Sequence, residues 1–137
     1  MKKIKCILLI DDDETTNIIN EMLIMDMGVT SELLQARNGK EGIELLQKKA
    51  DQNNLPELIL LDINMPVMDG FAFLEAYQKM DLPDKDSVII IMLTTSLNPS
   101  DVERARSAGV ADYISKPLTE KSLQSILEKH VRNNSTQ

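Results

Sequence analysis

The stretch Leu58-Ile59-Leu60-Leu61-Asp62 decides the fold of this chain, because an unbroken apolar run ends there on a carboxylate. Three other short apolar runs also end on polar side chains. They are Ile7 to Ile10 before Asp11 and Asp12, Val88 to Leu93 before Thr94 and Thr95, and Tyr113 to Ser115 before Lys116. If these runs are neighbouring parallel strands, their carboxyl ends meet at one edge of a sheet, where open α/β folds bind ligands. The pattern predicts a pocket containing three carboxylates, a hydroxyl and an ammonium group.

Helix-like stretches alternate with these strand-like runs along the chain. The expected strands are residues 5–10, 32–36, 57–61, 88–93 and 112–115, and the expected helices are residues 14–27, 39–51, 70–80, 99–108 and 119–132. A fivefold alternation of this kind predicts an α/β fold, with a parallel sheet covered by helices on both faces. Gaps between helix and sheet are filled by apolar side chains, and we expect Met22, Met25, Met27 and Met80 to serve as such core residues.

The spacing of apolar residues predicts which side of each helix is buried. In the first helix, the crowded side contains Ile18, Ile19, Met22, Leu23 and Met25. The corresponding residues are Ile43, Leu45 and Leu46 in the second helix, Phe73, Leu74, Tyr77 and Met80 in the third, and Leu123, Ile126, Leu127 and Val131 in the last. Asn98 before Pro99, and Thr119 with Ser122, predict the starts of two helices.

Length and composition exclude several classes of protein. The 137 residues suffice for one domain, expected at residues 1–132, with a frayed tail at residues 133–137. A formal charge of −7 opposes binding to nucleic acid or an anionic membrane, and no segment is apolar enough to span a bilayer. The single Cys6 cannot form an internal disulfide, and we expect it to be a buried, reduced side chain. These features predict a cytoplasmic protein with neither nucleic acid nor membrane as a partner.

The predicted cluster of Asp11, Asp12 and Asp62 calls for a cation. Helix capping explains one aspartate or two, but three carboxylates in one pocket repel one another and lose solvation. Oxygen ligands without clustered histidine or cysteine favour Mg²⁺, or Mn²⁺ as a substitute, and exclude zinc.

The remaining polar groups of the pocket suit a phosphoryl group. Lys116 supplies a positive charge for one phosphoryl oxygen, and Thr94 offers a hydroxyl donor to another. One aspartate is then placed to attack phosphorus in line and form an aspartyl-phosphate. The residues thus predict phosphoryl transfer onto the protein itself.

Four motifs in this order resemble the receiver domain of two-component response regulators, the CheY-like family. They are Asp11-Asp12, the block from Leu60 to Gly70, Thr94, and Tyr113-Ile114-Ser115-Lys116-Pro117. The resemblance covers about Ile4 to His130. It implies a flavodoxin-like, doubly wound sheet of five strands in the order 2-1-3-4-5, with five helices.

The resemblance also implies a role for each matching residue. Asp62 is the implied phospho-acceptor. Asp12 is an implied direct metal ligand, and Asp11 acts mainly through metal-bound water. The backbone carbonyl of Asn64 completes the implied protein ligands of the metal. Thr94 and Lys116 bind the phosphoryl group, Tyr113 is the rotating aromatic residue, and the Lys116–Pro117 bond is cis. Asn64 and Ser96 lie where the family tunes hydrolysis. The implied phosphodonor is a histidine kinase or a histidine phosphotransfer protein, and the implied downstream protein docks on the face formed by residues 99–131.

Other interpretations compete with the resemblance. A phosphatase of the haloacid-dehalogenase type also uses an aspartate, Mg²⁺ and a lysine, but it requires an aspartate where this chain has Asn64. A purely structural pseudo-receiver is disfavoured because every phosphotransfer position is filled. A receiver fragment of a transcription factor is disfavoured by the lack of a linker after His130. Three single residues also have alternative interpretations. Tyr113 is alternatively an aromatic residue packed within its strand, and Thr95 is an alternative to Thr94 as the phosphate-binding hydroxyl. Asp69 is interpreted as the start of a helix rather than as a metal ligand.

Overall fold

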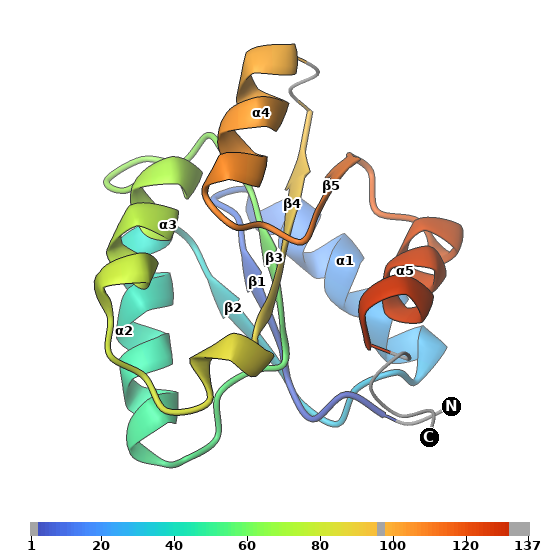
Figure 1. Ribbon diagram of the computed structural model, residues 1–137. Coiled ribbons are helices and arrows are strands. Elements are labelled where there is room, and N and C mark those ends of the chain that lie inside the picture. Colours follow the sequence, from blue (N-terminus) through green and yellow to red (C-terminus); the bar gives the residue numbers. More distant parts are fainter. Residues whose placement is uncertain (1–2, 96–97, 132–137) are drawn as a thin grey trace.

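Five parallel strands form one sheet in the computed structural model (Figure 1). They are β1 (Ile7–Ile10), β2 (Leu33–Ala36), β3 (Leu58–Leu61), β4 (Ile89–Thr94) and β5 (Asp112–Ser115), in the spatial order β2-β1-β3-β4-β5. The predicted fold class and strand order are therefore confirmed. The structure describes residues 3–95 and 98–131. The predicted tail at residues 133–137 and the predicted hydrolysis-tuning residue Ser96 lie outside the described residues.

Five α-helices lie in the described residues, and the two that follow Asn98 and Thr119 begin where the sequence predicts caps. They are α1 (Glu14–Met27), α2 (Gly39–Asp51), α3 (Gly70–Lys79), α4 (Pro99–Ser107) and α5 (Glu120–Ile126). The side chain of Asn98 accepts a hydrogen bond from the Ser100 amide, and Thr119 and Ser122 form a reciprocal capping box. Two details differ from the prediction. The last helix continues from α5 as a π-helical turn, η2 (Leu127–Val131), and the loop before β4 contains a short 3₁₀ turn, η1 (Lys85–Ser87).

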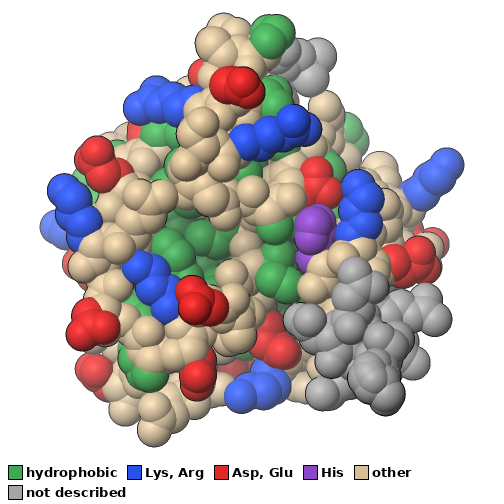
Figure 2. All heavy atoms as spheres, in the orientation of Figure 1, with side chains coloured by type: hydrophobic (Ala, Val, Ile, Leu, Met, Phe, Trp, Pro, Cys, Tyr) green, Lys and Arg blue, Asp and Glu red, His purple; other side chains and the backbone are tan. Residues whose placement is uncertain are grey.

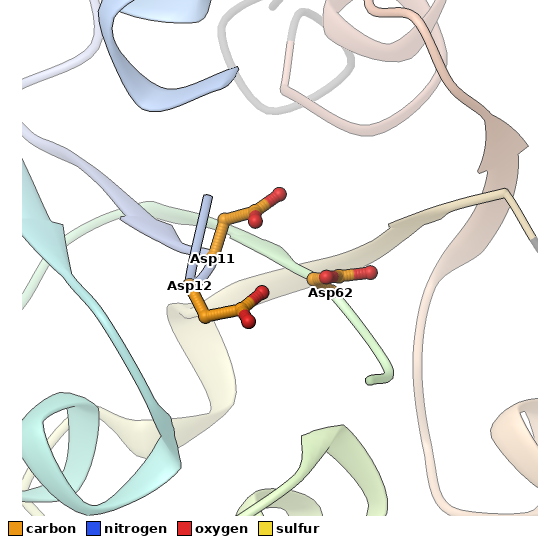
Figure 3. A group of neighbouring side chains, drawn as sticks. All are labelled: Asp11, Asp12 and Asp62. Carbon is orange, nitrogen blue, oxygen red and sulfur yellow. The ribbon is translucent and has the colours of Figure 1, made fainter. Parts of the chain in front are cut away.

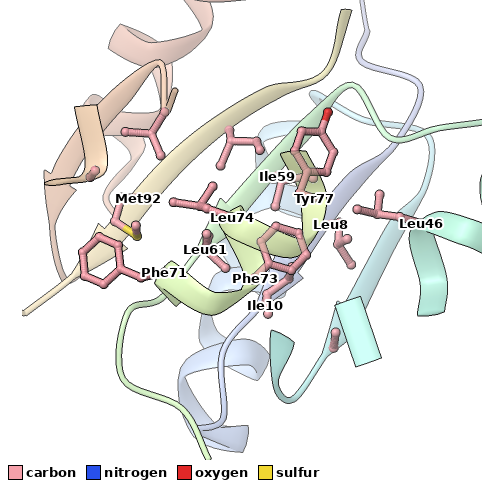
Figure 4. Packing of buried hydrophobic residues seen from close by; sticks show 14 of the residues in the cluster. Leu8, Ile10, Leu46, Ile59, Leu61, Phe71, Phe73, Leu74, Tyr77 and Met92 are labelled. Atoms are coloured by element: carbon pink, nitrogen blue, oxygen red, sulfur yellow. The ribbon is translucent and has the colours of Figure 1, made fainter. Parts of the chain in front are cut away.

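Alternate residues along the strands point into two separate cores. Leu8, Ile10, Ile59 and Leu61 pack with α2 and α3, chiefly against Phe73, Leu74 and Tyr77 (Figure 4). On the other face, Ile7, Leu9, Leu58 and Leu60 pack with Ile24 of α1 and with Leu123 and Ile126 of α5. The helices thus cover both faces of the sheet, with α1 and α5 together on one side (Figure 1). Cys6 is fully buried, as predicted.

The predicted buried face of α1 is wrong for four of its five residues, and only Leu23 packs against a core as predicted. Ile18, Ile19, Met22 and Met25 are 49–66% exposed, whereas the buried residues of the helix are Asn17, Asn20 and Ile24. Residues 17, 20 and 24 share one side because three- and four-residue steps return to the same face of a helix. At 100° per residue, Ile18, Met22 and Met25 lie on the opposite side. Met27 and Met80, in contrast, are partly buried and pack against the cores as predicted.

The strand register forms the polar edge that the sequence predicts. Ile10 pairs with Leu61, so Asp11 and Asp62 follow neighbouring strands at the same level. Thr94 pairs with Ser115, which places Lys116 directly after the end of the fifth strand. The fold therefore gathers the polar strand ends at one place. None of the helices in the described residues has the length and apolar character that crossing a membrane requires.

Candidate functional site

Three carboxylates meet where β1 and β3 end (Figure 3). One oxygen each from Asp11, Asp12 and Asp62 lies within 4.8 Å of the others. Asp11 and Asp62 are only 5% and 7% exposed, whereas Asp12 is open to solvent. Two buried anions this close repel each other strongly unless a positive charge lies beside them.

Lys116 supplies part of that positive charge. Its Nζ atom is 2.6 Å from Asp11 Oδ2 and 3.5 Å from Asp62 Oδ2, and the lysine side chain is largely buried. The Lys116–Pro117 peptide bond is cis, as the resemblance implies. Backbone amides bind the other carboxylate oxygens, with the Asp13 amide donating to Asp11 Oδ1 at 2.9 Å and the Ile63 amide donating to Asp62 Oδ1 at 2.8 Å. These contacts fix the orientation of both buried carboxylates.

The site disfavours the negative charge on Asp62. Burial raises the pKa of Asp62, and the neighbouring charge of Asp11 raises it further, while Lys116 and the Ile63 amide act in the opposite direction. For Lys116, burial lowers the pKa, but the hydrogen bonds and charges of Asp11 and Asp62 together raise it by more, and the net pKa lies above the ordinary value. The lysine is therefore firmly protonated, and the negative charge on Asp62 remains only partly compensated.

The donor set of the cluster fits a hard divalent cation. All nearby ligand atoms are carboxylate oxygens, which Mg²⁺ and Mn²⁺ prefer, and soft ligands are remote. The one cysteine, Cys6, is buried before β1, and the one histidine, His130, contacts Asp112 at 3.2 Å. The residues present thus match the expected Mg²⁺ or Mn²⁺ and do not form a zinc site.

The other predicted site residues lie on β4, on β5 and in the loop after β3. Thr94 is fully buried at the end of β4, whereas Thr95 is exposed. Asn64 is exposed in the loop after β3, and Tyr113 in β5 is half-buried and packs against the core beneath α4. Asp69 is the N-cap of α3, where its Oδ1 accepts a hydrogen bond from the Ala72 amide at 2.8 Å. This contact agrees with the prediction that Asp69 starts a helix.

Gly70 is a residue whose importance the sequence analysis missed. A Cβ atom added there would overlap the backbone carbonyl of Asp62, and the Gly70 amide donates a hydrogen bond to the Ile63 carbonyl at 2.7 Å. The sequence signal was the Asp69-Gly70 pair, but a turn explains that pair equally well. Only the structure shows that α3 approaches the end of β3 so closely that no side chain fits.

Gly70→Ala is expected to lower the free energy of unfolding by about 2 kcal/mol, the usual effect of overpacking. It should also slow phosphorylation of Asp62, because the displaced atoms belong to that residue's backbone. Chemical denaturation and the rate of modification by acetyl phosphate measure the two effects. Gly28→Ala is the matched control, since its positive φ of 65° disfavours alanine far from the cluster and should affect stability alone. Wild-type stability of Gly70→Ala would contradict the observed close approach.

Comparison with known proteins agrees with this geometry. Residues 7–128 match the family described as the response regulator receiver domain. A two-component response regulator from Cytophaga hutchinsonii has a crystal structure with a TM-score of 0.88 and 31% identity, and the match covers 96% of this chain and 99% of that one. Chemotaxis protein CheY4 of Vibrio cholerae matches with a TM-score of 0.75 and 27% identity over 93% of this chain and 99% of that one.

A sequence relative shows the same domain within a much longer protein. The sensor histidine kinase CheAY of Helicobacter pylori is 32% identical over 126 residues, which are 92% of this chain but only 15% of that protein. The resemblance stated from the sequence motifs is thereby confirmed over nearly the whole chain. The chain belongs to the response regulator receiver family of two-component signalling.

Proposed function

We propose that this chain is a response regulator receiver that accepts a phosphoryl group on Asp62 from a phosphohistidine. The supporting observation is the buried Asp62 carboxylate, which lies within 4.8 Å of two other carboxylates and 3.5 Å from the Lys116 ammonium. An Asp62 oxygen attacks phosphorus, the histidine nitrogen–phosphorus bond breaks, and the imidazole leaves as a neutral ring with its proton on the other nitrogen. The product is an acyl phosphate on the protein itself. Slow hydrolysis of this bond resets the switch.

Each residue around Asp62 has a part in this reaction. Asp12, Asp11, Asp62 and the backbone carbonyl of Asn64 are the proposed ligands of Mg²⁺, for which Mn²⁺ can substitute. When bound, the metal neutralises negative charge on the transferring phosphoryl group. Lys116 is near enough to turn from Asp11 toward a phosphoryl oxygen, and Thr94 offers its hydroxyl to another. These residues orient the phosphoryl group and offset its charge.

The proposed output of phosphorylation is a change in the face formed by residues 99–131. Thr94 moves toward the new phosphoryl oxygens, and the half-buried Tyr113 turns into the space that is vacated. Figure 2 shows acidic and basic side chains mixed over the visible part of this face. A mixed surface of this kind favours a protein as the downstream partner over nucleic acid. A cytoplasmic location, with Cys6 reduced, completes the proposal.

Acetyl phosphate with Mg²⁺ tests the proposed chemistry without any partner protein. The wild-type chain should gain the mass of one phosphoryl group, and the adduct should survive acid but not base, as an acyl phosphate does. Omitting Mg²⁺ should greatly reduce the adduct. Catalytic hydrolysis of many phosphate esters without a lasting adduct would instead support the phosphatase interpretation.

The exposed apolar side of α1 is the proposed contact for the phosphodonor. Ile18, Met22 and Met25 form a stripe on a helix that begins three residues after Asp11. A donor that brings its histidine to Asp62 has to cover the surface beside the cluster, and an apolar stripe there gives it contact area. This accounts for large hydrophobic residues on the solvent side of the helix.

Met22→Glu is expected to abolish phosphotransfer from a phosphorylated histidine kinase while leaving modification by acetyl phosphate unchanged. The new charge has to be desolvated in the protein complex, but the small molecule does not contact α1. A kinase that phosphorylates the wild type is first identified from a purified panel, and transfer of radiolabelled phosphate is then compared. Lys48→Glu, an exposed change on α2, is the control. Equal transfer to Met22→Glu and wild type would exclude the stripe as the donor contact.

A further inference from the structure

A small cavity of about 10 Å³ lies against the acidic cluster, on the face of the sheet that α1 covers. Apolar side chains from β1, β3 and β4 form part of its wall, and four polar residues complete it: Asp11, Asn17, Asn20 and Asp62. A volume of this size holds one water molecule when polar groups surround it. The cavity therefore has the size and the polar lining of a buried water site.

Asn17 has one satisfied and one unsatisfied polar atom at this cavity. Its side chain is 2% exposed, and its Nδ2 donates a hydrogen bond to the backbone carbonyl of Asp11 at 2.9 Å. A carbonyl only accepts hydrogen bonds, so this contact fixes which way the amide points. The Oδ1 atom is then left buried with no hydrogen-bond partner among the described residues.

The protein groups around the cavity do not satisfy that oxygen. The carboxylates of Asp11 and Asp62 are acceptors when ionised and therefore cannot donate to it. Asn20 has donor hydrogens, but it makes no hydrogen bond to Asn17 Oδ1. The oxygen requires a small molecule with two donor hydrogens, one for the amide and one for a carboxylate.

We propose that one ordered water molecule fills this cavity and that Asn17 is a positioning residue for the acidic cluster. The water donates one hydrogen bond to Asn17 Oδ1 and the other to a carboxylate of Asp11 or Asp62. Asn17 thus holds the acidic cluster at two points, through the Asp11 backbone carbonyl and through the water that donates to one of the buried carboxylates. The inference extends the proposed function, because it assumes that the cluster binds a divalent cation.

The proposal explains the reversed polarity of α1. Side chains of Asp11 and Asp62 alternate with those of Ile10 and Leu61 and so point to the same side as Leu9 and Leu60, where α1 lies. An apolar residue at position 17 would place hydrocarbon beside two buried carboxylates. The buried asparagines supply polar contacts there, and the large apolar residues of α1 occupy its outer side.

Asn17→Leu tests the proposal, because leucine has a similar size but neither donor nor acceptor. The variant should bind Mg²⁺ about tenfold more weakly, the lower end of the range seen when a residue that orients metal ligands is lost. Mg²⁺ affinity is measured by NMR titration of backbone amides, which requires no phosphorylation. The thermal unfolding midpoint should fall as well, because the Asp11 carbonyl loses its donor and leucine lies beside two buried carboxylates, so Mg²⁺ affinity is measured well below that midpoint. Asn17→Ala leaves room for a second water and should have intermediate affinity.

The water itself is sought in a crystal structure of the wild-type protein at atomic resolution. Density for one water within hydrogen-bond distance of Asn17 Oδ1 supports the proposal. An empty cavity, or a cation with short contacts to several oxygens, overturns it. Wild-type Mg²⁺ affinity in Asn17→Leu also overturns it, and Ile19→Ala, at an exposed position of α1, is the control for nonspecific effects. If the wild-type chain accepts no phosphoryl group, the proposed function fails. The electron density for the water and the Mg²⁺ affinity still test the role of Asn17, because neither measurement requires phosphorylation.

Discussion

Lys116→Met is expected to lower the free energy of unfolding by about 3 kcal/mol at neutral pH in Mg²⁺-free buffer. The lysine ammonium is 2.6 Å from Asp11 and 3.5 Å from Asp62, and all three side chains are largely buried. Methionine fills the same space but leaves two buried carboxylates facing each other without a cation. Because the paired lysine has a raised pKa, its stabilisation is complete at neutral pH and is lost only as the pH rises through that raised value.

Urea denaturation of the wild type and of Lys116→Met measures this difference. Lys48→Met is the control, because Lys48 is exposed on α2 and its removal should change stability little. Acidification should reduce the difference in free energy of unfolding between the wild type and Lys116→Met, because the carboxylates of Asp11 and Asp62 become protonated. If Lys116→Met and Lys48→Met are equally stable at neutral pH, Lys116 does not hold the acidic cluster together.

Asp62→Asn is expected to abolish modification by acetyl phosphate and, at the same time, to stabilise the fold. The amide cannot act as the nucleophile, but its oxygen can still accept the hydrogen bond from the Ile63 amide. The change removes one of two buried, repelling charges, while Lys116 remains paired with Asp11. In Mg²⁺-free buffer the thermal unfolding midpoint should rise by a few degrees. Asp26→Asn, at an exposed position of α1, is the control for loss of charge alone.

The stabilisation by Asp62→Asn should depend on pH in a defined direction. Burial and the charge of Asp11 raise the pKa of Asp62, so the native state keeps this proton to a higher pH than the unfolded chain. The stabilising contribution of the protonated form is complete below the ordinary pKa of aspartate and is lost as the pH rises through the raised pKa. The gain in stability of Asp62→Asn over the wild type should therefore be small at acid pH and should grow as the pH rises to neutral. A stability difference between Asp62→Asn and the wild type that stays constant from acid to neutral pH would contradict the electrostatic explanation.

The sheet and the acidic cluster were predictable because strand ends carry their own signal. The apolar runs before Asp11, Asp62 and Lys116 are short, unbroken and bounded by polar residues, and the register places these residues at one edge as expected. At the end of β4 the structure buries Thr94 and exposes Thr95, the alternative hydroxyl at that strand end. In these places local sequence and tertiary structure require the same arrangement.

The orientation of α1 could not be predicted from periodicity alone. The helix has one polar stripe with Asn17 and Asn20 and one apolar stripe with Ile18 and Met22, and helical spacing does not say which of them faces inward. The neighbouring strands determine which stripe of α1 faces inward, because the buried carboxylates at their ends require polar contacts from the helix. That requirement appears only once β1, β3 and α1 are placed together.

Gly70 illustrates a different limit of sequence reasoning. The contact that excludes a side chain there joins α3 to the carbonyl of Asp62, eight positions earlier in the chain. A glycine at a helix start has ordinary local explanations, so only three-dimensional proximity reveals this requirement.

Locating the phosphoryl group on the chain tests the central claim most directly. After reaction with acetyl phosphate and Mg²⁺, borohydride reduces an aspartyl-phosphate to homoserine, and peptide mass spectrometry identifies the altered residue. The account predicts homoserine at position 62, formed only when Mg²⁺ is present and Lys116 is intact. Modification at Asp11 or Asp12 instead, or a phosphoryl group on a serine, threonine or histidine, would contradict it.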